Sequence, residues 1–440
     1  MSDITLPKKR LLSLFSGCGG MDLGLEGGIK VRIESLSPAN HHWIDHDHGD
    51  GWVTLKPTCF ETVFANDVAR AAKAAWEPYF KGVRGNSNAT FIQGSIVDLV
   101  KAAHQGEFAF PTDIDILTGG FPCQDFSVAG KRKGFASHKA HHGNLLAFGH
   151  DCPTEENRGV LYKWMREVIA LTQPKVFIAE NVKGLVSLPN VKAIIAKDFA
   201  TVGKGYHVLS PQVLHATRYG VPQTRERVFF IALRKDCLTP RATELLKQGR
   251  LHLYPQPTHY LPTEGSLWAV HPQLAPWVSC GHVLADLPEP DASNDPAHQG
   301  YSKAKYMGKH CQGQREIDLT KPSPTIRSEH HGNIEFRRLA QEHGGQHLHE
   351  LALHYPERRL TVRECARLQT FPDDLALVRR STDDTKLSIT EGYKLVGNAV
   401  PPLLAYHVAQ QLQSQWSLLF EEVNDDIIGE LPTDRVRAFA

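Results

Sequence analysis

The most restrictive feature of the sequence is a short apolar segment that ends in two glycines. Residues 113–117 (DIDIL) are predicted to form a buried strand of a parallel sheet, because a brief apolar run bounded by turn residues suits a strand covered on both faces. Gly119 and Gly120 then allow a sharp turn, and Pro122 fixes the backbone beside Cys123. Open α/β sheets bind ligands at the carboxyl ends of their strands, so Cys123 is predicted to lie at such an edge.

The surroundings of Cys123 decide between two interpretations. A lone cysteine is most often a buried packing residue. Here, however, residues 127–134 (SVAGKRKG) are polar, basic and contain glycine, which does not suit a core. A nearby positive charge lowers the pKa of a thiol and makes it a nucleophile. We therefore interpret Cys123 as a reactive residue.

A second glycine turn follows residues 10–15, another predicted strand. The run Ser16-Gly17-Cys18-Gly19-Gly20 comes next, and a helix is predicted to begin at Met21. Strand, glycine turn and helix are typical of nucleotide binding, because the first turn of a helix presents free amides. The spacing is not GxGxxG and the P-loop lysine is absent, so a tight structural turn remains the alternative.

Polar residues also end the next predicted strands. Asp67 follows residues 60–65, where it could accept hydrogen bonds from ribose hydroxyls or cap a helix. Glu180 follows residues 175–179, where it could exchange a proton in a dry pocket or act as a cap. Another strand, at 90–93, runs into Ser95. The pattern predicts an α/β fold with a mostly parallel, Rossmann-like sheet.

Two arginines lie between predicted strands at 206–214 and 228–233. Arg225 and Arg227 are two residues apart, so their side chains are on the same side if this piece is extended. They could hold a base, a phosphate or the flap described next, and the alternative is that they are solvated at the surface.

Two long segments lack apolar periodicity. Residues 34–58 are predicted to form an inserted surface loop, because Pro, Gly, Asn and Asp recur in them. Residues 124–158, which we call the flap, carry Lys131, Arg132 and Lys133 and few apolar side chains. Such a segment could close over a phosphate backbone, although a plain solvated loop is the alternative for its second half.

The regular alternation of strands and helices stops near residue 235. Residues 255–324 are rich in Pro, Gly, His and Trp, and basic and aromatic side chains are interleaved there, which suits phosphate contact and base reading. A helix capped by Thr361, a glycine turn at 392–402 and an apolar helix at 403–418 follow. We therefore predict three parts: residues 1–234, residues 235–358, and a return segment, 359–440, that completes the first domain.

Composition limits the class of protein. The net charge is +1, so any nucleic acid must be held by local patches, and no stretch has the apolar length of a membrane span. Eight cysteines occur without a CxxC pair, which indicates a reducing cytoplasm and gives no zinc spacing. The 24 histidines are better interpreted as solvated loop residues than as metal ligands, so no metal is expected.

Taken in order, the motifs closely resemble the DNA (cytosine-5)-methyltransferase family of bacterial restriction–modification systems. The matching pieces, which cover nearly the whole chain apart from the insertions and the variable domain, are FSGCGGMDLG at 15–24, FANDVARAA at 64–72, GGFPCQDFSVAGKRKGF at 119–135, RGVLY at 158–162, AENVKGL at 179–185, YGVPQTRERVFFIALR at 219–234, RLTVRECARLQTFPDD at 359–374 and GNAVPP at 397–402.

The resemblance implies S-adenosylmethionine as the methyl donor and a cytosine in double-stranded DNA as the acceptor. It implies a catalytic role for Cys123, Glu180, Arg225 and Arg227. It implies that the cofactor is bound by Phe15, Gly17, Gly19, Asp67, Ser95, Ile96, Pro122, Leu161, Asn398, Ala399 and Val400. It implies that DNA is contacted by Gln124, Ser127, Lys131, Arg132, Lys133 and Arg327, with residues 235–358 as the target-recognition domain.

The chemistry of cytosine supports these assignments. A thiolate that adds at carbon 6 activates carbon 5, Glu180 would bind ring N3 and the amino group, and the base must first be flipped out of the stack. A monomeric cytoplasmic bacterial enzyme is expected, and a cognate restriction endonuclease would act on the same site without having to bind the chain.

Two departures and three alternatives accompany the resemblance. The family usually has Asp where this chain has Ser95, and the flap is longer than usual. A tRNA cytosine methyltransferase shares the catalytic motifs, but the long irregular domain favours a DNA reader. An inactive binding module is disfavoured because Cys123, Glu180 and Arg227 are all present, and a dinucleotide oxidoreductase is disfavoured because GxGxxG is missing.

Overall fold

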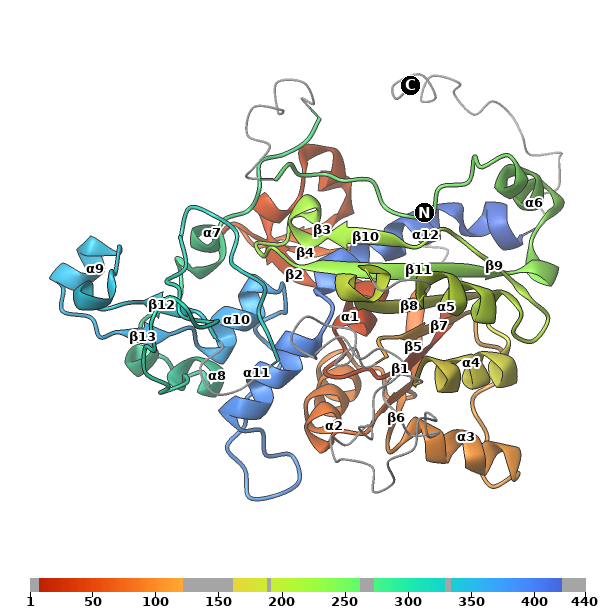
Figure 1. Cartoon of the computed structure of the whole chain (residues 1–440), viewed down its shortest axis with the longest axis horizontal. Helices are drawn as coiled ribbons and strands as arrows, with labels where there is room; N and C mark the ends of the chain where they lie inside the picture. Colours follow the sequence, from red (N-terminus) through yellow and green to blue (C-terminus); the bar gives the residue numbers. More distant parts are fainter. Residues whose placement is uncertain (1–7, 122–160, 188–190, 262–272, 329–333, 422–440) are drawn as a thin grey trace.

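The computed structural model describes residues 8–121, 161–187, 191–261, 273–328 and 334–421. Its centre is a sheet of eight strands, and a smaller, less regular lobe lies to one side of it (Figure 1). The strands are β1 (Lys9–Leu14), β5 (Phe60–Asp67), β6 (Thr90–Gln93), β7 (Ile116–Gly119), β8 (Val176–Val182), β9 (Tyr206–Val208), β10 (Gln212–His215) and β11 (Glu226–Arg234).

The order across the sheet is β10-β11-β8-β7-β1-β5-β6, and β9 pairs with β11 beside β10. Strands β8, β7, β1, β5 and β6 are parallel, whereas β11 runs antiparallel to β8, β9 and β10. The predicted α/β class with a mostly parallel sheet is therefore confirmed. The strand predicted at 90–93 has the observed bounds, and β7 begins later than the strand predicted at 113–117.

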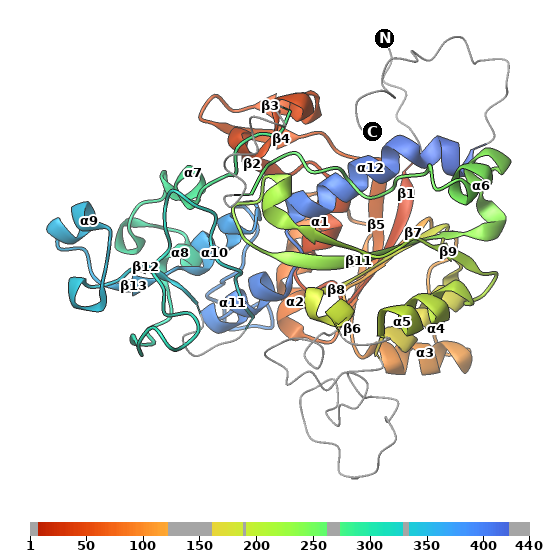
Figure 2. The ribbon, with the colours of Figure 1, turned by 45° about the horizontal axis from the view of Figure 1, so that its top comes forward.

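Both faces of the sheet are buried, and neighbouring residues of one strand belong to different cores. Leu11 packs in one apolar cluster and Leu12 in the other, and Phe229 and Phe230 divide in the same way. The first cluster includes side chains of α1 (Gly20–Glu26), α2 (Arg70–Glu77) and α12 (Pro402–Phe420). The second includes side chains of α3 (Ile96–His104), α4 (Leu161–Thr172) and α5 (Val191–Ala200), so helices cover each face (Figure 2).

Helix α12 returns to the N-terminal part of the chain and lies against α1. A Cβ atom on Gly24 would collide with the Pro402 carbonyl oxygen and Ala405 Cβ, and it would stand 2.8 Å from the Tyr406 amide nitrogen. The two helices therefore approach so closely that only glycine fits at this crossing. Helix α6 (Pro240–Lys247) packs against α12, and the Thr239 amide donates to the Leu419 carbonyl.

The smaller lobe consists of short elements joined by irregular backbone. They are α7 (Cys280–Leu284), α8 (Pro296–Gln299), β12 (Phe336–Arg338), α9 (Leu348–Ala352), β13 (Arg358–Arg359), α10 (Val362–Leu368) and, where the lobe meets the sheet, α11 (Ile389–Asn398). Buried ion pairs help to hold it: Arg358 Nη1 lies 2.9 Å from Glu364 Oε2, and Arg338 bridges Glu289 and Glu350. Breaking such a pair is costly because it leaves a buried charge alone. Thr361 and Glu364 form a capping box at the start of α10, which confirms the predicted cap.

Residues 34–58 do not form the predicted loop. They contain a 3-10 helix (Pro38–Trp43) and strands β3 (Ile44–Asp47) and β4 (Trp52–Leu55), and β4 pairs with both β3 and β2 (Lys30–Arg32) in a small antiparallel sheet. The prediction was wrong because β3 and β4 have only four residues each, too few to show an alternation among the surrounding Pro, Gly, Asn and Asp. Val53 and Leu55 are buried, and the Trp43 ring packs edge-on against Tyr406 and His407 of α12.

The glycine turn predicted at 392–402 is also wrong, because α11 occupies most of it. A capping box between Ser388 and Glu391 starts this helix. Gly392 serves packing rather than turning, since a Cβ there would lie 2.7 Å from the Leu377 carbonyl oxygen and 2.9 Å from Val362. The predicted single strand at 206–214 is two strands, β9 and β10, with Pro211 between them, which has no amide for a ladder.

Among the described residues, no helix is both long enough and apolar enough to cross a bilayer.

The α1–α12 crossing gives a first prediction. Gly24→Ala should lower the free energy of unfolding by about 1–3 kcal/mol, because the methyl group overpacks the contact. The matched control is Gly82→Ala, since a Cβ at Gly82 would meet nothing within 4 Å. Urea denaturation of both variants measures the difference, and equal stability of the two would contradict the account of the crossing.

Candidate active site at the carboxyl edge of the sheet

The carboxyl ends of β1 and β7 lie side by side at the point where the strand order reverses. From β1 the chain continues to β5 and β6 on one side, and it later returns to β7 on the other. Leu14 at the end of β1 is in register with Gly119 at the end of β7. The segments that follow these strands therefore emerge together, at the position where open α/β sheets place ligands.

The turn after β1 has an unusual backbone. Phe15 has φ +54°, a conformation that a bulky side chain rarely adopts, and Gly17 has φ +55°. A Cβ on Gly17 would meet nothing within 4 Å, so there is open space beside this residue. Gly19 is different, because a Cβ there would lie 2.5 Å from the Phe80 ring. The Trp76 and Phe80 rings, which stack on each other, therefore pack directly against the turn at Gly19.

Asp67 ends β5 and is tied to this turn. One carboxylate oxygen accepts from the Gly17 amide at 2.9 Å, and the other accepts from the Ala69 amide at 2.8 Å. Burial raises the pKa of Asp67, and these backbone hydrogen bonds oppose the shift. Each carboxylate oxygen keeps a second lone pair, so Asp67 can hold the turn and still accept from a ligand hydroxyl.

The turn after α11 lies against the turn after β1. A Cβ on Gly20 would collide with the Val400 carbonyl oxygen and stand 3.1 Å from Ala399 Cβ. The structure thus brings Ala399 and Val400 next to the glycine turn, and Asn398 is exposed beside them. Ser95 instead caps α3 by accepting from the Val97 amide, and Ile96 and Leu161 are buried in the second core.

Glu180 of β8 lies beside Gly120, the residue that directly follows β7. A Cβ on Gly120 would stand 3.1 Å from Glu180 Oε2, so no larger residue fits beside the carboxylate without a shift. The Asn181 amide group donates to the Phe121 carbonyl at 3.0 Å. Strand β8 therefore fixes the last described residues before Pro122 next to Glu180.

The Glu180 carboxylate is paired with Arg227 from the neighbouring strand. Arg227 Nε lies 2.9 Å from Oε1, yet this oxygen is buried and forms no hydrogen bond, because the guanidinium approaches off the hydrogen-bond direction. Burial raises the pKa of Glu180, and the charges of Arg227 and Arg225 lower it by less. Oε1 is therefore held by the charge of Arg227, and Oε2 is the oxygen beside Gly120, where a ligand N–H could donate to it.

Arg225 lies apart from this pair. It is fully buried, its Nη1 donates to the Ile326 carbonyl at 3.0 Å, and its Nη2 donates to the Gly397 carbonyl at 2.8 Å. Arg227 therefore contacts the Glu180 carboxylate, whereas Arg225 joins its own segment to the backbone at Ile326 and at Gly397.

Arg327 is partly exposed, with its Nη1 4.0 Å from Glu335 Oε1. The other predicted functional residues of this region lie outside the described residues: Pro122, Cys123, Gln124, Ser127, Lys131, Arg132 and Lys133. In the described part of the chain, no group of three or more His, Cys, Asp or Glu side chains could hold a metal ion.

Three buried amides were not predicted as site residues: Asn181, Gln223 and Gln369. Each is almost fully buried and bonded to backbone or to another amide. The signal was present in the motifs ENV, PQTRER and RLQTFP, where a lone amide interrupts apolar or charged residues. Such a residue needs partners inside the protein.

The raised pKa of Glu180 predicts how Glu180→Gln changes stability with pH. The ionised carboxylate destabilises the fold, so wild-type stability is fully present below the unfolded pKa of about 4.3 and is lost as pH rises through the folded pKa. The glutamine stays neutral, so the free energy of unfolding of the variant should rise relative to that of the wild type as pH increases above the unfolded pKa, a trend that urea denaturation measures.

Glu391→Gln is the matched control with the opposite sign. Burial raises the pKa of Glu391, but hydrogen bonds from Ser388 and the charge of Arg70 outweigh it and lower the pKa overall. The free energy of unfolding of this variant should fall relative to that of the wild type as pH rises from acid values. The same trend for both variants would show that the environment of Glu180 has been misjudged.

Comparison with known proteins identifies the family. The family model for C-5 cytosine-specific DNA methylase matches residues 9–414. The chain is 31% identical to Type II methyltransferase M.NgoFVII of Neisseria gonorrhoeae, over 95% of this chain and 90% of that protein. It is 28% identical to Type II methyltransferase M.BsuRI of Bacillus subtilis, over 96% and 82%.

Two solved structures share the fold. One is the Dnmt2 methyltransferase of S. pombe, with a TM-score of 0.51 and 16% identity over 92% of this chain and 99% of that one. The other is the methyltransferase EhMeth of Entamoeba histolytica, with a TM-score of 0.53 and 14% identity over 93% and 99%. The sequence match over almost the whole length, carried by this fold and this edge of the sheet, shows that the chain belongs to the C-5 cytosine-specific DNA methylases.

Proposed function

We propose that the enzyme transfers a methyl group from S-adenosylmethionine to carbon 5 of a cytosine that is flipped out of a specific duplex DNA sequence. The observation that carries the proposal is the buried Glu180 carboxylate, whose Oε1 is paired with Arg227 and whose Oε2 lies beside Gly120, next to the residues that lead to Cys123. Cytosine offers the complementary group, since its amino group is a donor and N3 becomes one when it is protonated.

The described residues fit the methyl donor. Gly17 has open space beside it, Asp67 retains acceptor capacity for ribose hydroxyls, and Ala399 and Val400 lie against the same turn. Phe15 presents a ring at the end of β1, where the family stacks adenine. When bound, S-adenosylmethionine supplies an electrophilic methyl group. Ser95 is occupied as a helix cap, so we assign it a supporting role and not an adenine contact.

The chain's own groups would activate the base. The Cys123 thiolate adds to carbon 6, and the electron pair of the 5,6 double bond makes carbon 5 nucleophilic. Glu180 binds N3 and the amino group and stabilises the charge that develops there, and Arg227 orients Glu180 and the carbonyl oxygen of the base. After carbon 5 has been methylated, it loses its proton, and the returning electron pair expels the thiolate of Cys123.

The remaining assignments concern DNA. We propose residues 235–358 as the target-recognition domain, residues 1–234 and 359–440 as the two parts of the catalytic domain, and Arg327 as a DNA contact. Gln124, Ser127 and the basic flap residues would contact the DNA near the flipped base. The relatives are named Type II methyltransferases, which supports a role in protecting DNA from a cognate restriction endonuclease.

Covalent trapping tests the proposed function. Duplex DNA with 5-fluorocytosine at the target should form a stable adduct at Cys123, because fluorine cannot leave as the proton does. Cys123→Ser should form no adduct and lose methyl transfer, since a hydroxyl is far less ionised than a thiol at neutral pH. Peptide mapping locates the adduct, and recovery of another residue would refute the covalent scheme. Methylation of tRNA in place of duplex DNA would favour a tRNA enzyme.

The flap should contribute affinity without sequence preference. Replacing Lys131, Arg132 and Lys133 with Gln should weaken binding to every DNA sequence alike and reduce the salt dependence by about one unit of log–log slope for each lost phosphate contact. Binding titrations at several salt concentrations measure this slope. A change in the preferred base would instead place the flap among the sequence-reading elements.

A further inference from the structure

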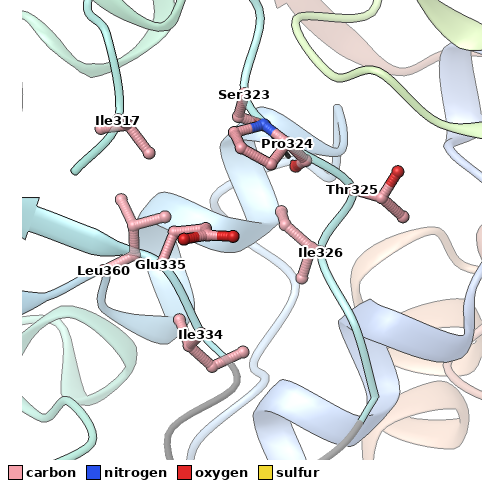
Figure 3. Close-up of a pocket in the computed structure, with 8 residues that line it drawn as sticks. All are labelled: Ile317, Ser323, Pro324, Thr325, Ile326, Ile334, Glu335 and Leu360. Carbon is pink, nitrogen blue, oxygen red and sulfur yellow. Dashed lines mark hydrogen bonds between the residues drawn. The ribbon is translucent and has the colours of Figure 1, made fainter. Parts of the chain in front are cut away.

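Residues 323–328, which we call the strap, run between the smaller lobe and the edge of the sheet. On one side they face the lobe across a small hollow: Ser323, Pro324, Thr325 and Ile326 lie opposite Ile317, Leu360, Ile334 and Glu335 (Figure 3). Ile326 is buried with Ile334 and Leu360 in the first core. Apolar packing therefore holds the strap to the lobe.

On the other side, hydrogen bonds hold the strap to the segment before β11. The Thr224 amide donates to the Ser323 carbonyl at 2.8 Å, and the Ser323 amide donates to the Pro222 carbonyl at 2.9 Å. The Ile326 amide donates to Gln223 Oε1 at 3.1 Å. Gln223 is fully buried, so this bond is shielded from water.

Gln223 is connected in turn to Gln369, which comes just after α10. Gln223 Nε2 donates to Gln369 Oε1 at 3.0 Å, and Gln369 Nε2 donates to the Val396 carbonyl at 2.6 Å and the Ala399 carbonyl at 2.7 Å. Gln369 is fully buried as well. Two amides thus join the strap to residues 396–400. We call residues 397–400 the cofactor turn, because they lie against the glycine turn after β1 that is proposed to bind the methyl donor.

A second, parallel connection runs through Arg225 and Gly397. Arg225 donates to Ile326 in the strap and to Gly397 in the turn. A Cβ on Gly397 would collide with the backbone of Arg327 and Ser328. The strap and the turn are therefore in backbone contact, and neither can shift without disturbing the other.

We propose that Gln223 and Gln369 are positioning residues that fix the cofactor turn and the DNA-reading lobe in one arrangement, so that each amide affects both cofactor affinity and sequence discrimination. This inference rests on the proposed function, because it takes the lobe to be the part that reads DNA. It goes beyond that function in assigning one buried amide pair to two binding sites. Neither residue touches a reacting group.

The test exploits which bonds a glutamate can keep. Gln223→Glu keeps the acceptor for Ile326 but loses the donor to Gln369, so its direct partner in the strap is preserved. Gln369→Glu keeps the acceptor for Gln223 but loses both bonds to residues 396–399. Calorimetry with S-adenosylhomocysteine measures cofactor affinity, and methylation of the mapped site and its single-base variants measures discrimination.

The proposal predicts an effect at the distant site in each case. Gln223→Glu should weaken S-adenosylhomocysteine binding about tenfold, a change typical of a lost buried hydrogen bond to a neighbouring group. Gln369→Glu should lower discrimination between the site and its variants by about the same factor. A variant with both Gln223→Glu and Gln369→Met, which avoids two adjacent carboxylates, should lose little more than either of these changes alone, because both break one connection.

Gln411→Glu is the control. Gln411 of α12 donates to the His252 carbonyl at 2.7 Å in an exposed hydrogen bond, so this variant loses an amide donor away from both sites and should leave both measurements unchanged. If the glutamate variants do not fold, Gln369→Met carries the test without a charge, because within the described part of the chain the Gln369 side chain bonds only Gln223 and residues 396–399 and has no direct partner in the strap.

The outcomes are distinct. If Gln223→Glu altered only discrimination and Gln369→Glu altered only cofactor affinity, the two amides would be separate supports and the proposal would be overturned. A wild-type enzyme that methylates no DNA site would instead contradict the proposed function.

Discussion

The helices that cover both faces of the central sheet determine where a functional site can lie. Leu11 and Leu12 point into different cores, so the central strand β1 has no face left for chemistry. Function is therefore restricted to the carboxyl edge, where side chains and turns extend beyond the packed layers. The segments after β1, β5, β7 and β8 meet at that edge, and the turn after α11 joins them from the far end of the chain.

The charges at this edge show the balance between stability and activity. Glu180 is a buried carboxylate whose arginine partner does not satisfy its oxygen. A packing-optimised protein would place an apolar or fully bonded residue there. The burial that raises the pKa of Glu180 lowers stability when the carboxylate is ionised, and under the proposed function this is the cost of keeping a carboxylate for the base. Arg225, two residues from Arg227, has the opposite environment, because backbone carbonyls accept from it.

Much of this arrangement could be predicted from the sequence, because local signals coincide with the fold. The strand at 90–93, the capping box at Thr361 and the glycine turn after β1 all follow from short patterns of residue type. Glu180 could be placed near a strand end for the same reason, although β8 continues through it to Val182 and does not stop at residue 179.

Other features depend on partners distant in the chain. The small sheet at 30–55 consists of strands too short to show alternation, and Gly392 looked like a turn residue although it accommodates Val362 and a backbone carbonyl. The contacts of Gln223 with Gln369 join residues 146 positions apart, which no local pattern reveals.

The crossing of α12 over α1 has a consequence for how the protein is made. The ribosome synthesises residues 20–26 long before residues 402–420, so the apolar side of α1 stays exposed until α12 has been made. Contacts between residues so far apart in the chain slow folding. The backbone of Val400 also forms part of the support of the glycine turn at Gly20. A nascent chain without this segment therefore lacks this support, and under the proposed function methyl transfer can begin only after α12 has been synthesised.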